Sequence, residues 1–350
     1  MRVAIIAITA NGAKLGATLK SGLPQSSLFV LEKHETCGAE PFSERVPALM
    51  ERLWPDFDGF VCIMATGIVV RSIAPLLKGK DVDPAVVTID DAGRFAVSLL
   101  SGHLGGANAL AASCAELTGA TPVITTATDA NELPSFDMIA KENGWRIEEL
   151  SRVKVLNALL LEGKRIAVLD PTGKVAEYCQ GKGNLIFCRD ADDALACGAD
   201  GVVVVTSGAV PHGLDPSRTL VLRPVELCLG IGCNRGTSAD EIEAVVERYL
   251  AQLSLSLKSV RCLASAEAKA DEEGLLTCAK RKGLPLLFFS SDELNKVTVP
   301  SPPSDHAFAA IGARGVAEPA ALLASDGGSL ILKKVKDGNV TIAIARCALA

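Results

Sequence analysis

The stretch SGHLGGANAL, residues 101–110, combines a histidine with three glycines. His103 has an unperturbed pKa close to neutrality, so its imidazole can gain or lose a proton near pH 7. Gly102, Gly105 and Gly106 lack a Cβ atom and let the backbone approach a neighbouring group closely. The alternative is a structural histidine in a strand-to-helix turn. We predict that His103 takes part in proton transfer.

Other polar side chains follow apolar runs in the same part of the chain. Thr66 comes after the predicted strand 59–65, and Asp129 comes shortly after the predicted strand 121–126. Ligands of open α/β sheets bind at the carboxyl ends of strands, so we expect these polar residues to gather at one edge of a sheet. Ordinary solvated surface charges are the alternative for each arginine among them. The predicted members of this site besides His103 are Thr66, Gly67, Arg71, Asp90, Asp91, Arg94, Asn108 and Thr126.

A second glycine-rich segment, GIGCNRGTSADE, covers residues 230–241. Its GxGxxxG spacing is one residue longer than the dinucleotide fingerprint. Ser238 and Glu241 form a capping-box pattern, which predicts that a helix begins there. Exposed amides before a helix favour a phosphate or carboxylate, while a turn without a ligand is the alternative. The residues of this predicted anion site are Gly230, Gly232, Asn234, Arg235 and Gly236.

The next helix of this kind, predicted within residues 313–325, carries Glu318 in its first turn. A carboxylate there is stabilised by the positive end of the helix dipole. We therefore interpret Glu318 as a residue that stabilises the start of this helix and binds no ligand.

The elements that must position these residues alternate between strands and helices. Apolar runs such as 2–8 and 59–65 predict buried strands, and 107–119 predicts a helix, which together indicate largely parallel sheets. Residues 85–90 and 94–100 are separated by DAG and predict a β-hairpin. The predicted fold is a multi-domain α/β protein of three-layer units. We place its domains at 1–130, 131–224 and 225–350, and expect the first to be catalytic.

Three strands are predicted in the middle domain, at 165–170, 184–188 and 201–207. The last domain is predicted to close with a hairpin that turns at KDGN. The polar, proline-containing segment ATDANELPSFD, which begins at Ala127, is interpreted as a domain boundary.

The composition excludes several classes of protein. The formal net charge is −6, whereas a broad nucleic-acid surface needs a basic excess. The eleven cysteines include no CxxC pair, which favours reduced thiols over a disulfide framework or a zinc site. The apolar run at the N-terminus is too short to span a membrane and lacks a cleavage pattern, so we expect a cytoplasmic protein.

Three segments of the chain together resemble regions of one known protein family. The sequence MATGIVVRSIAPLLKGKDVDPAVVTIDDAGRFAVSLLSGHLGGANALA resembles the N-terminal region of the cobalt-precorrin-5A hydrolase (CbiG) family of anaerobic cobalamin biosynthesis. LCLGIGCNRGTSADEI and GVAEPAALLAS resemble the C-terminal region of that family. The middle of the chain resembles the family only loosely.

This resemblance implies a reaction. The substrate of the family is a cobalt corrinoid with many carboxylates and a δ-lactone that ties an acetate side chain to the bridge carbon C20. Water opens the lactone, and C20 leaves with its methyl group as acetaldehyde, giving cobalt-precorrin-5B. The cobalt belongs to the substrate, so no cofactor is expected. A homodimer and transient contacts with neighbouring pathway enzymes are left open.

Lactone hydrolysis needs a base, an oxyanion stabiliser and a proton relay. Under the resemblance we assign the base or relay to His103, oriented by Asp90 or Asp91, and the oxyanion site to the amides of Gly105 and Gly106. The further assigned contacts, which position water or the lactone carbonyl or bind substrate carboxylates, are Arg71, Lys78, Arg94, Asn108, Thr126 and Arg235.

Two other classes of protein are kept as alternatives. A corrinoid carrier binds a pathway intermediate without releasing acetaldehyde. A nucleotide-dependent α/β enzyme uses the loop at 230–236, although the chain lacks a P-loop and a regular GxGxxG.

Overall fold

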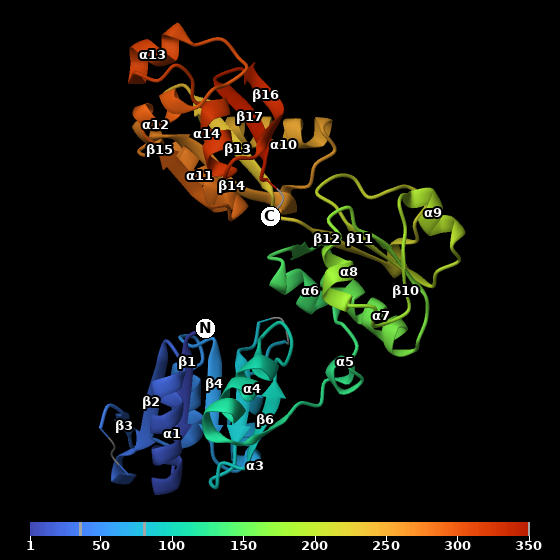
Figure 1. Ribbon diagram of the computed structural model, residues 1–350. Helices are drawn as coiled ribbons and strands as arrows, with labels where there is room; N and C mark the ends of the chain where they lie inside the picture. Colours follow the sequence, from blue (N-terminus) through green and yellow to red (C-terminus); the bar gives the residue numbers. More distant parts are fainter. Residues whose placement is uncertain (35–36, 80–81, 349–350) are drawn as a thin grey trace. The chain divides into compact units, whose positions relative to one another are not determined.

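The computed structural model describes residues 1–34, 37–79 and 82–348, without the side chains of residues 306 and 307. The chain divides into two compact units, Met1–Met138 and Ile139–Ala350 (Figure 1). The fold is α/β with three largely parallel sheets, which confirms the predicted fold class. Each predicted domain contains one sheet, and the exact boundaries stay a prediction. No helix in the described ranges is long and apolar enough to cross a membrane.

The first unit contains one sheet of seven strands. Its strands are β1 (Val3–Ala7), β2 (Ser26–Leu31), β3 (Glu40–Phe42), β4 (Gly59–Ile63), β5 (Ala85–Ile89), β6 (Phe95–Leu100) and β7 (Thr121–Val123). Their order across the sheet is β3-β2-β1-β4-β5-β6-β7. The β5–β6 pair is antiparallel, which confirms the predicted hairpin, and the other pairs are parallel. The short strand β3 was not predicted.

Helices cover both faces of this sheet. Those on its faces are α1 (Ala10–Gly22), α2 (Val46–Leu53), α3 (Thr66–Ile73) and α4 (Ala107–Thr118). After β7 follow α5 (Ala127–Ala130) and α6 (Phe136–Glu142), and α6 continues into the second unit. Leu19 of α1 and Leu110 of α4 pack into the apolar core on one face. Leu49 of α2 and Val69 of α3 pack into the core on the other face. The buried β1, whose five residues are all apolar, lies between these two layers.

The β5–β6 hairpin reverses the strand direction within the sheet. The carboxyl ends of β6 and β7 therefore lie at the edge opposite the carboxyl ends of β1, β4 and β5. The hydroxyl of Ser101, just after β6, donates to the carbonyl of Asp83, just before β5, over 2.9 Å. We call the edge after β6 and β7 the histidine edge, and the edge after β1, β4 and β5 the carboxyl edge.

This reversal corrects the prediction of a single site at one edge. The carboxyl edge carries Thr66, Gly67, Asp90, Asp91 and Arg94, because they follow β4 or belong to the hairpin turn. The other group is at the histidine edge, which carries His103, Asn108 and Thr126. Two edges of one sheet are a strand length apart, which is about 16 Å for five residues.

The middle of the chain forms a second sheet, in the order β10-β9-β11-β12-β8. The strands are β8 (Arg146–Ile147), β9 (Ile166–Leu169), β10 (Leu185–Phe187), β11 (Gly201–Val205) and β12 (Thr219–Arg223), and the helices are α7 (Leu150–Leu161), α8 (Lys174–Cys179) and α9 (Ala191–Ala196). β9, β10 and β11 confirm the three predicted strands. β12 was missed because it ends in a charged residue, Arg223, which is only 6% exposed and donates to Glu148 over 2.5 Å.

The last sheet has the order β15-β14-β13-β17-β16. Its strands are β13 (Leu227–Cys233), β14 (Val260–Ala266), β15 (Leu286–Phe289), β16 (Ser329–Asp337) and β17 (Val340–Arg346), and its helices are α10 (Ala239–Gln252), α11 (Glu273–Lys282), α12 (Ser291–Lys296), α13 (Asp305–Ile311) and α14 (Ala317–Ala324). The closing hairpin is confirmed by the antiparallel pairing of β16 with β17. Within the described ranges there are also five short 3-10 helices: Glu32–His34, Ala74–Leu76, Pro216–Arg218, Leu257–Ser259 and Glu267–Lys269.

Two predictions about helix starts need correction. Ser238 caps α10 by accepting from the amide of Glu241, but the Glu241 carboxylate accepts from the amide of Asn339 over 2.9 Å instead of returning to the cap. Glu318 is 2% exposed and does more than favour a helix dipole. Its carboxylate accepts from the Ser301 hydroxyl over 2.7 Å and from the Lys334 amide over 2.9 Å, which ties a loop and β16 to α14.

Candidate active site at the histidine edge

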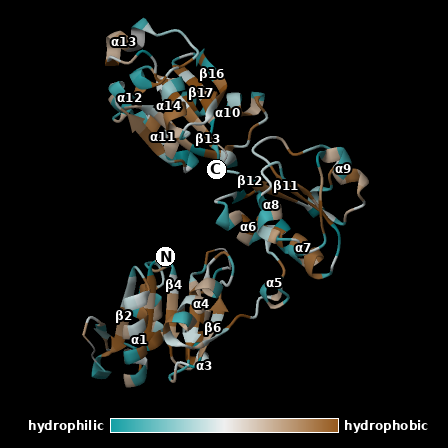
Figure 2. Cartoon of the chain, in the orientation of Figure 1, coloured by the Kyte–Doolittle hydropathy of each residue, from teal (hydrophilic) through white to brown (hydrophobic). Residues whose placement is uncertain are grey.

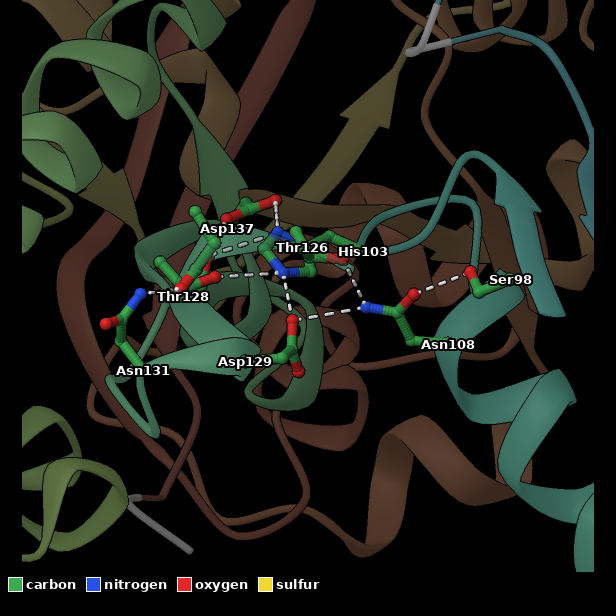
Figure 3. A network of polar contacts seen from close by, with 10 residues as sticks. Ser98, His103, Asn108, Thr126, Thr128, Asp129, Asn131 and Asp137 are labelled. Atoms are coloured by element: carbon green, nitrogen blue, oxygen red, sulfur yellow. Dashed lines mark hydrogen bonds and ion pairs between the residues drawn. The ribbon is translucent and has the colours of Figure 1, made fainter. Parts of the chain in front are cut away.

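His103 belongs to the loop between β6 and α4, and its side chain lies between two carboxylates (Figure 3). Its Nε2 lies 2.8 Å from Oδ2 of Asp129, and its Nδ1 lies 3.3 Å from Oδ2 of Asp137. The hydroxyl of Thr128 lies 3.1 Å from the same Nε2. Both ring nitrogens therefore have carboxylate partners, an arrangement that favours the imidazolium form.

A second set of contacts holds Asp129 in place. Nδ2 of Asn108 donates to Oδ2 of Asp129 over 3.2 Å and to the Thr126 hydroxyl over 2.9 Å. The hydroxyl of Ser98, on β6, donates to Oδ1 of Asn108 over 2.7 Å. Asn108 therefore connects the sheet to the segment after β7. This places the predicted residues Asn108 and Thr126 in the same cluster as His103.

The members of the cluster differ in their access to water. The side chain of Asp137 is 8% exposed and that of His103 is 15% exposed, whereas that of Asp129 is 42% exposed. Asp137 also accepts a hydrogen bond from the hydroxyl of Ser135. The buried side of the cluster is thus preorganised, and Asp129 is the carboxylate that a solvent molecule or substrate can reach.

The surroundings raise the pKa of His103 above its ordinary value. The hydrogen bond to Asp137 is the largest cause; burial acts in the opposite direction, and the hydrogen bond to Asp129 adds to the rise. The imidazole is therefore held in its protonated form to higher pH than a free histidine. An imidazolium can donate a proton, so we favour the predicted role of proton relay over that of primary general base, and this role stays a prediction.

The glycine loop around His103 uses its amides internally. The Gly106 amide donates to the carbonyl of His103 over 2.9 Å, and the Asn108 amide donates to the carbonyl of Gly102 over 3.0 Å. This corrects the predicted oxyanion role of Gly106. A Cβ atom on Gly105 would lie 2.7 Å from the carbonyl oxygen of Ser101, so glycine is required there because the loop packs on itself.

Asp90 and Asp91 do not orient His103, because they lie at the carboxyl edge. Asp90 accepts from the amides of Arg94 and Phe95 over 2.8 and 2.7 Å, which closes the hairpin turn. Asp91 accepts from the hydroxyl of Thr9 and from Nδ2 of Asn11, the latter over 3.4 Å. The prediction that one of them positions the histidine is wrong, and Asp129 and Asp137 take that place.

The amide of the predicted contact Lys78 donates to the carboxylate of Asp83, just before β5, over 3.0 Å, so Lys78 does not lie at the carboxyl edge. Thr66, Gly67, Arg71 and Arg94 do lie there. The hydroxyl of Thr66 lies 3.3 Å from that of Thr88, and Nη1 of Arg71 donates to the carbonyl of Gly67 over 3.0 Å. The side chain of Arg94 is 73% exposed. These residues form a second polar group, separate from the His103 cluster.

The chain matches three family models in sequence order: Cobalamin synthesis G N-terminal over residues 48–129, Cobalamin biosynthesis central region over 134–224, and Cobalamin synthesis G C-terminus over 227–345. It is 38% identical to the cobalt-precorrin-5A hydrolase of Priestia megaterium, over 98% of this chain and 94% of that protein. The chain belongs to the cobalt-precorrin-5A hydrolase family. The family predicted from the sequence is thereby confirmed.

One further curated relative and one solved structure are also similar to this chain. The chain is 32% identical to the cobalt-precorrin-5A hydrolase of Salmonella typhimurium, over 98% of this chain and 97% of that one. A crystal structure of a cobalamin biosynthesis protein G homolog from Sulfolobus solfataricus is 23% identical and covers 99% of this chain and 97% of its own, with a TM-score of 0.36.

In this member of the cobalt-precorrin-5A hydrolase family, the glycine loop after β13 binds a carboxylate of the same chain, that of Glu272. The Gly236 amide donates to the carboxylate of Glu272 over 2.6 Å, and Lys269 lies 3.1 Å from the same carboxylate, which is 3% exposed. Burial raises the pKa of Glu272, but the Gly236 amide and Lys269 outweigh it and hold the pKa below the ordinary value. Arg235 pairs with Asp271 over 2.8 Å. The predicted external anion at the Gly236 amide is therefore corrected to an internal carboxylate, whereas the predicted substrate contact of Arg235, whose side chain is 65% exposed, stays a prediction.

The other predicted residues of this loop have structural partners. A Cβ on Gly230 would lie 1.8 Å from the carbonyl oxygen of Ala317, so glycine lets α14 pack directly on β13. Nδ2 of Asn234 donates to Oδ1 of Asn339 over 2.9 Å, which ties the loop to the closing hairpin. Gly232 has ordinary spacing to its neighbours, and its predicted substrate contact stays a prediction.

Three members of the His103 cluster were not predicted from the sequence: Thr128, Ser135 and Asp137. All three belong to the polar segment 127–137, which the sequence pattern indicates as a domain boundary. The sequence feature that could have identified this segment as part of the site is its high density of hydroxyls and carboxylates just after a strand. The loop that carries His103 lies at the same histidine edge.

Proposed function

We propose that this protein is a cobalt-precorrin-5A hydrolase of cobalamin biosynthesis. It opens the δ-lactone of its substrate with water and releases acetaldehyde, leaving cobalt-precorrin-5B. The observation that carries this function is the similarity to curated hydrolases of that name over nearly the whole chain. The substrate is a small cobalt corrinoid, and its cobalt enters as part of that substrate, so we assign no resident cofactor.

We assign the hydrolytic step to the His103 cluster. Both hydrogen bonds to Asp129 fall on Oδ2, and Oδ1 points away from them (Figure 3). Oδ1 of Asp129 is placed to take a proton from a water molecule as its oxygen adds to the lactone carbonyl carbon. A positioned carboxylate of this kind contributes about 10² to 10⁴ in rate.

His103 supplies the proton that the leaving oxygen needs. As the acyl C–O bond breaks, the alkoxide on C20 takes the proton of Nε2. In the second step that oxygen loses its proton, the C20 oxygen becomes a carbonyl, and the bond from C20 to the macrocycle breaks. The electron pair left on the macrocycle carbon is then protonated. An imidazole relay between a base and solvent can carry these protons in turn.

Asp137 is a positioning residue in this scheme. Its carboxylate contacts Nδ1 of His103 from the buried side, which fixes the ring and directs Nε2 toward Asp129. Asn108 has the equivalent task for Asp129, because its amide donates to Oδ2. Both residues act through the group they hold.

The function is tested by acetaldehyde release. Purified protein is mixed anaerobically with enzymatically prepared cobalt-precorrin-5A, and acetaldehyde is followed with a coupled alcohol dehydrogenase. We expect release above the no-protein control and a large loss in His103→Ala. His212→Ala, at an exposed histidine of the second unit, is the matched control. Tight corrinoid binding without acetaldehyde would support the carrier alternative instead.

The nucleotide-dependent alternative loses its main support, since the amide of Gly236 is used by Glu272. A homodimer, contacts with neighbouring pathway enzymes and a cytoplasmic location stay predictions. Sedimentation of the purified protein measures the first of them.

A further inference from the structure

The outer part of the first sheet has an apolar face. Side chains alternate along a strand, so Phe95, Val97 and Leu99 of β6 point to one side. Val97 pairs with Thr88 of β5, and the Thr88 hydroxyl contacts Thr66 of α3. These side chains therefore share the face of the sheet on which α3 packs.

This face is open at its outer end. Phe95 is 46% exposed, and Val97 and Leu99 are only partly buried. In the neighbouring edge strand β7, Thr121 pairs with Phe95 and is exposed, and Val123 pairs with Val97 and is partly buried. Figure 2 shows β6 among the strongly hydrophobic segments of this unit. We call Phe95, Val97, Thr121 and Val123 the open face.

A cation adjoins the open face. The guanidinium of Arg94 lies 5.8 Å from the centre of the Phe95 ring, is 73% exposed and keeps one contact of 3.5 Å with Asp90. On α3, Val70 lies one helical turn after Thr66 and is 45% exposed, and its neighbour Arg71 is also exposed. Exposed apolar surface beside arginines suits a ligand that is flat and apolar at its centre and carries carboxylates around its rim.

We propose that the open face binds the plane of the corrinoid macrocycle, and that Arg94 and Arg71 bind carboxylates on its rim. This inference rests on the proposed function and names the surface that recognises its substrate. The occupant follows from complementarity: the ring of Phe95 stacks on the macrocycle, and the two arginines at the carboxyl edge match its acidic side chains.

The direction of β6 connects this surface to the His103 cluster. β6 begins at Phe95 beside Arg94 and leads toward His103, and its six residues span about 17 Å from first to last. A macrocycle lying along β6 has one rim at the arginines and directs the other toward the histidine edge. The two polar groups of the first unit then serve one substrate, one by binding and the other by chemistry.

The test measures KM and kcat for acetaldehyde release. A change in KM reports on substrate binding, and a change in kcat reports on the chemical steps. We expect Phe95→Ser and Arg94→Glu each to raise KM about tenfold, and Phe95→Tyr to keep the KM of the unchanged protein. Phe187→Ser and Arg189→Glu, at exposed positions of the second unit, are the matched controls and leave KM unchanged. Thermal melting of each variant verifies the fold.

Two failures can be told apart. If the unchanged protein releases no acetaldehyde, the proposed function is wrong. If it does release acetaldehyde, but Phe95→Ser and Arg94→Glu fold normally and keep the original KM, the open face is not the binding surface. An equal rise in KM in the Phe187 or Arg189 controls would also overturn the proposal.

Discussion

Nδ1 of His103 lies 3.3 Å from Oδ2 of Asp137, across the gap between the strand-to-helix loop and the start of α6. This contact closes the segment after β7 over the histidine edge. It is the more buried half of the cluster, since the side chain of Asp137 is 8% exposed. The opposite half, at Asp129, opens to solvent and is where we place the chemistry.

Replacing Asp129 tests that placement. Asp129→Asn keeps the shape and one acceptor for His103 but cannot take a proton from water. We expect kcat to fall about 100-fold or more, with a smaller change in KM. Asp192→Asn, at an exposed aspartate of α9, is the control for the same chemical change. Acetaldehyde release within twofold of the unchanged protein would remove Asp129 from the mechanism.

The second prediction is that His103 titrates at a higher pH than a free histidine. Because the contacts with Asp137 and Asp129 raise the pKa of His103, its NMR titration should have a midpoint above that of a free histidine. Asp137→Asn removes the largest cause and should shift that midpoint toward lower pH. Equal midpoints in both proteins would show that Asp137 does not hold the imidazolium.

The same shift makes stability depend on pH. The folded-state pKa of His103 lies above the unfolded value, so its contribution is complete below about pH 6.5 and is lost as the pH rises through the folded-state pKa. Urea unfolding should show a larger deficit of His103→Gln at about pH 6 than at about pH 9. A deficit that grows toward alkaline pH would contradict the assigned protonation state.

Gly105→Ala tests the close packing of the glycine loop. The new Cβ would lie 2.3 Å from Cβ of Ser101 and 2.7 Å from its carbonyl oxygen, so the loop must shift. We expect a loss of about 1 to 3 kcal/mol and a lower kcat. Gly67→Ala is the control for stability, because its Cβ meets only the flexible end of Arg71 at 3.1 Å. Equal thermal midpoints in the two variants would refute the argument.

The internal anion of the second unit predicts a gain of binding. Glu272→Ala leaves Lys269 and the Gly236 amide without their carboxylate and should cost about 3 kcal/mol. Sulfate should then raise the thermal midpoint of this variant more than that of the unchanged protein, since an anion can occupy the vacated position. Glu273→Ala, at the exposed neighbouring residue, should show neither effect.

Local pattern was sufficient for much of the fold. The run RVAIIAI predicted the buried β1, Ser238 predicted the start of α10, and DAG between two apolar runs predicted the β5–β6 hairpin. These features depend on side-chain periodicity and turn chemistry within a few residues. β12 was not predicted. The burial of its charged residue Arg223 depends on an ion pair with Glu148, which is distant in sequence.

For this protein, sequence alone determined the family and the α/β class and predicted His103 as a site residue, because long motifs and local periodicity depend on consecutive residues. Only the tertiary structure decided which carboxylates surround His103. The antiparallel pairing of β5 with β6 sends Asp90 and Asp91 to one edge and His103 to the other, and strand direction is a property of the assembled sheet. Asp129 and Asp137 then meet the histidine because the chain after β7 returns to the same edge.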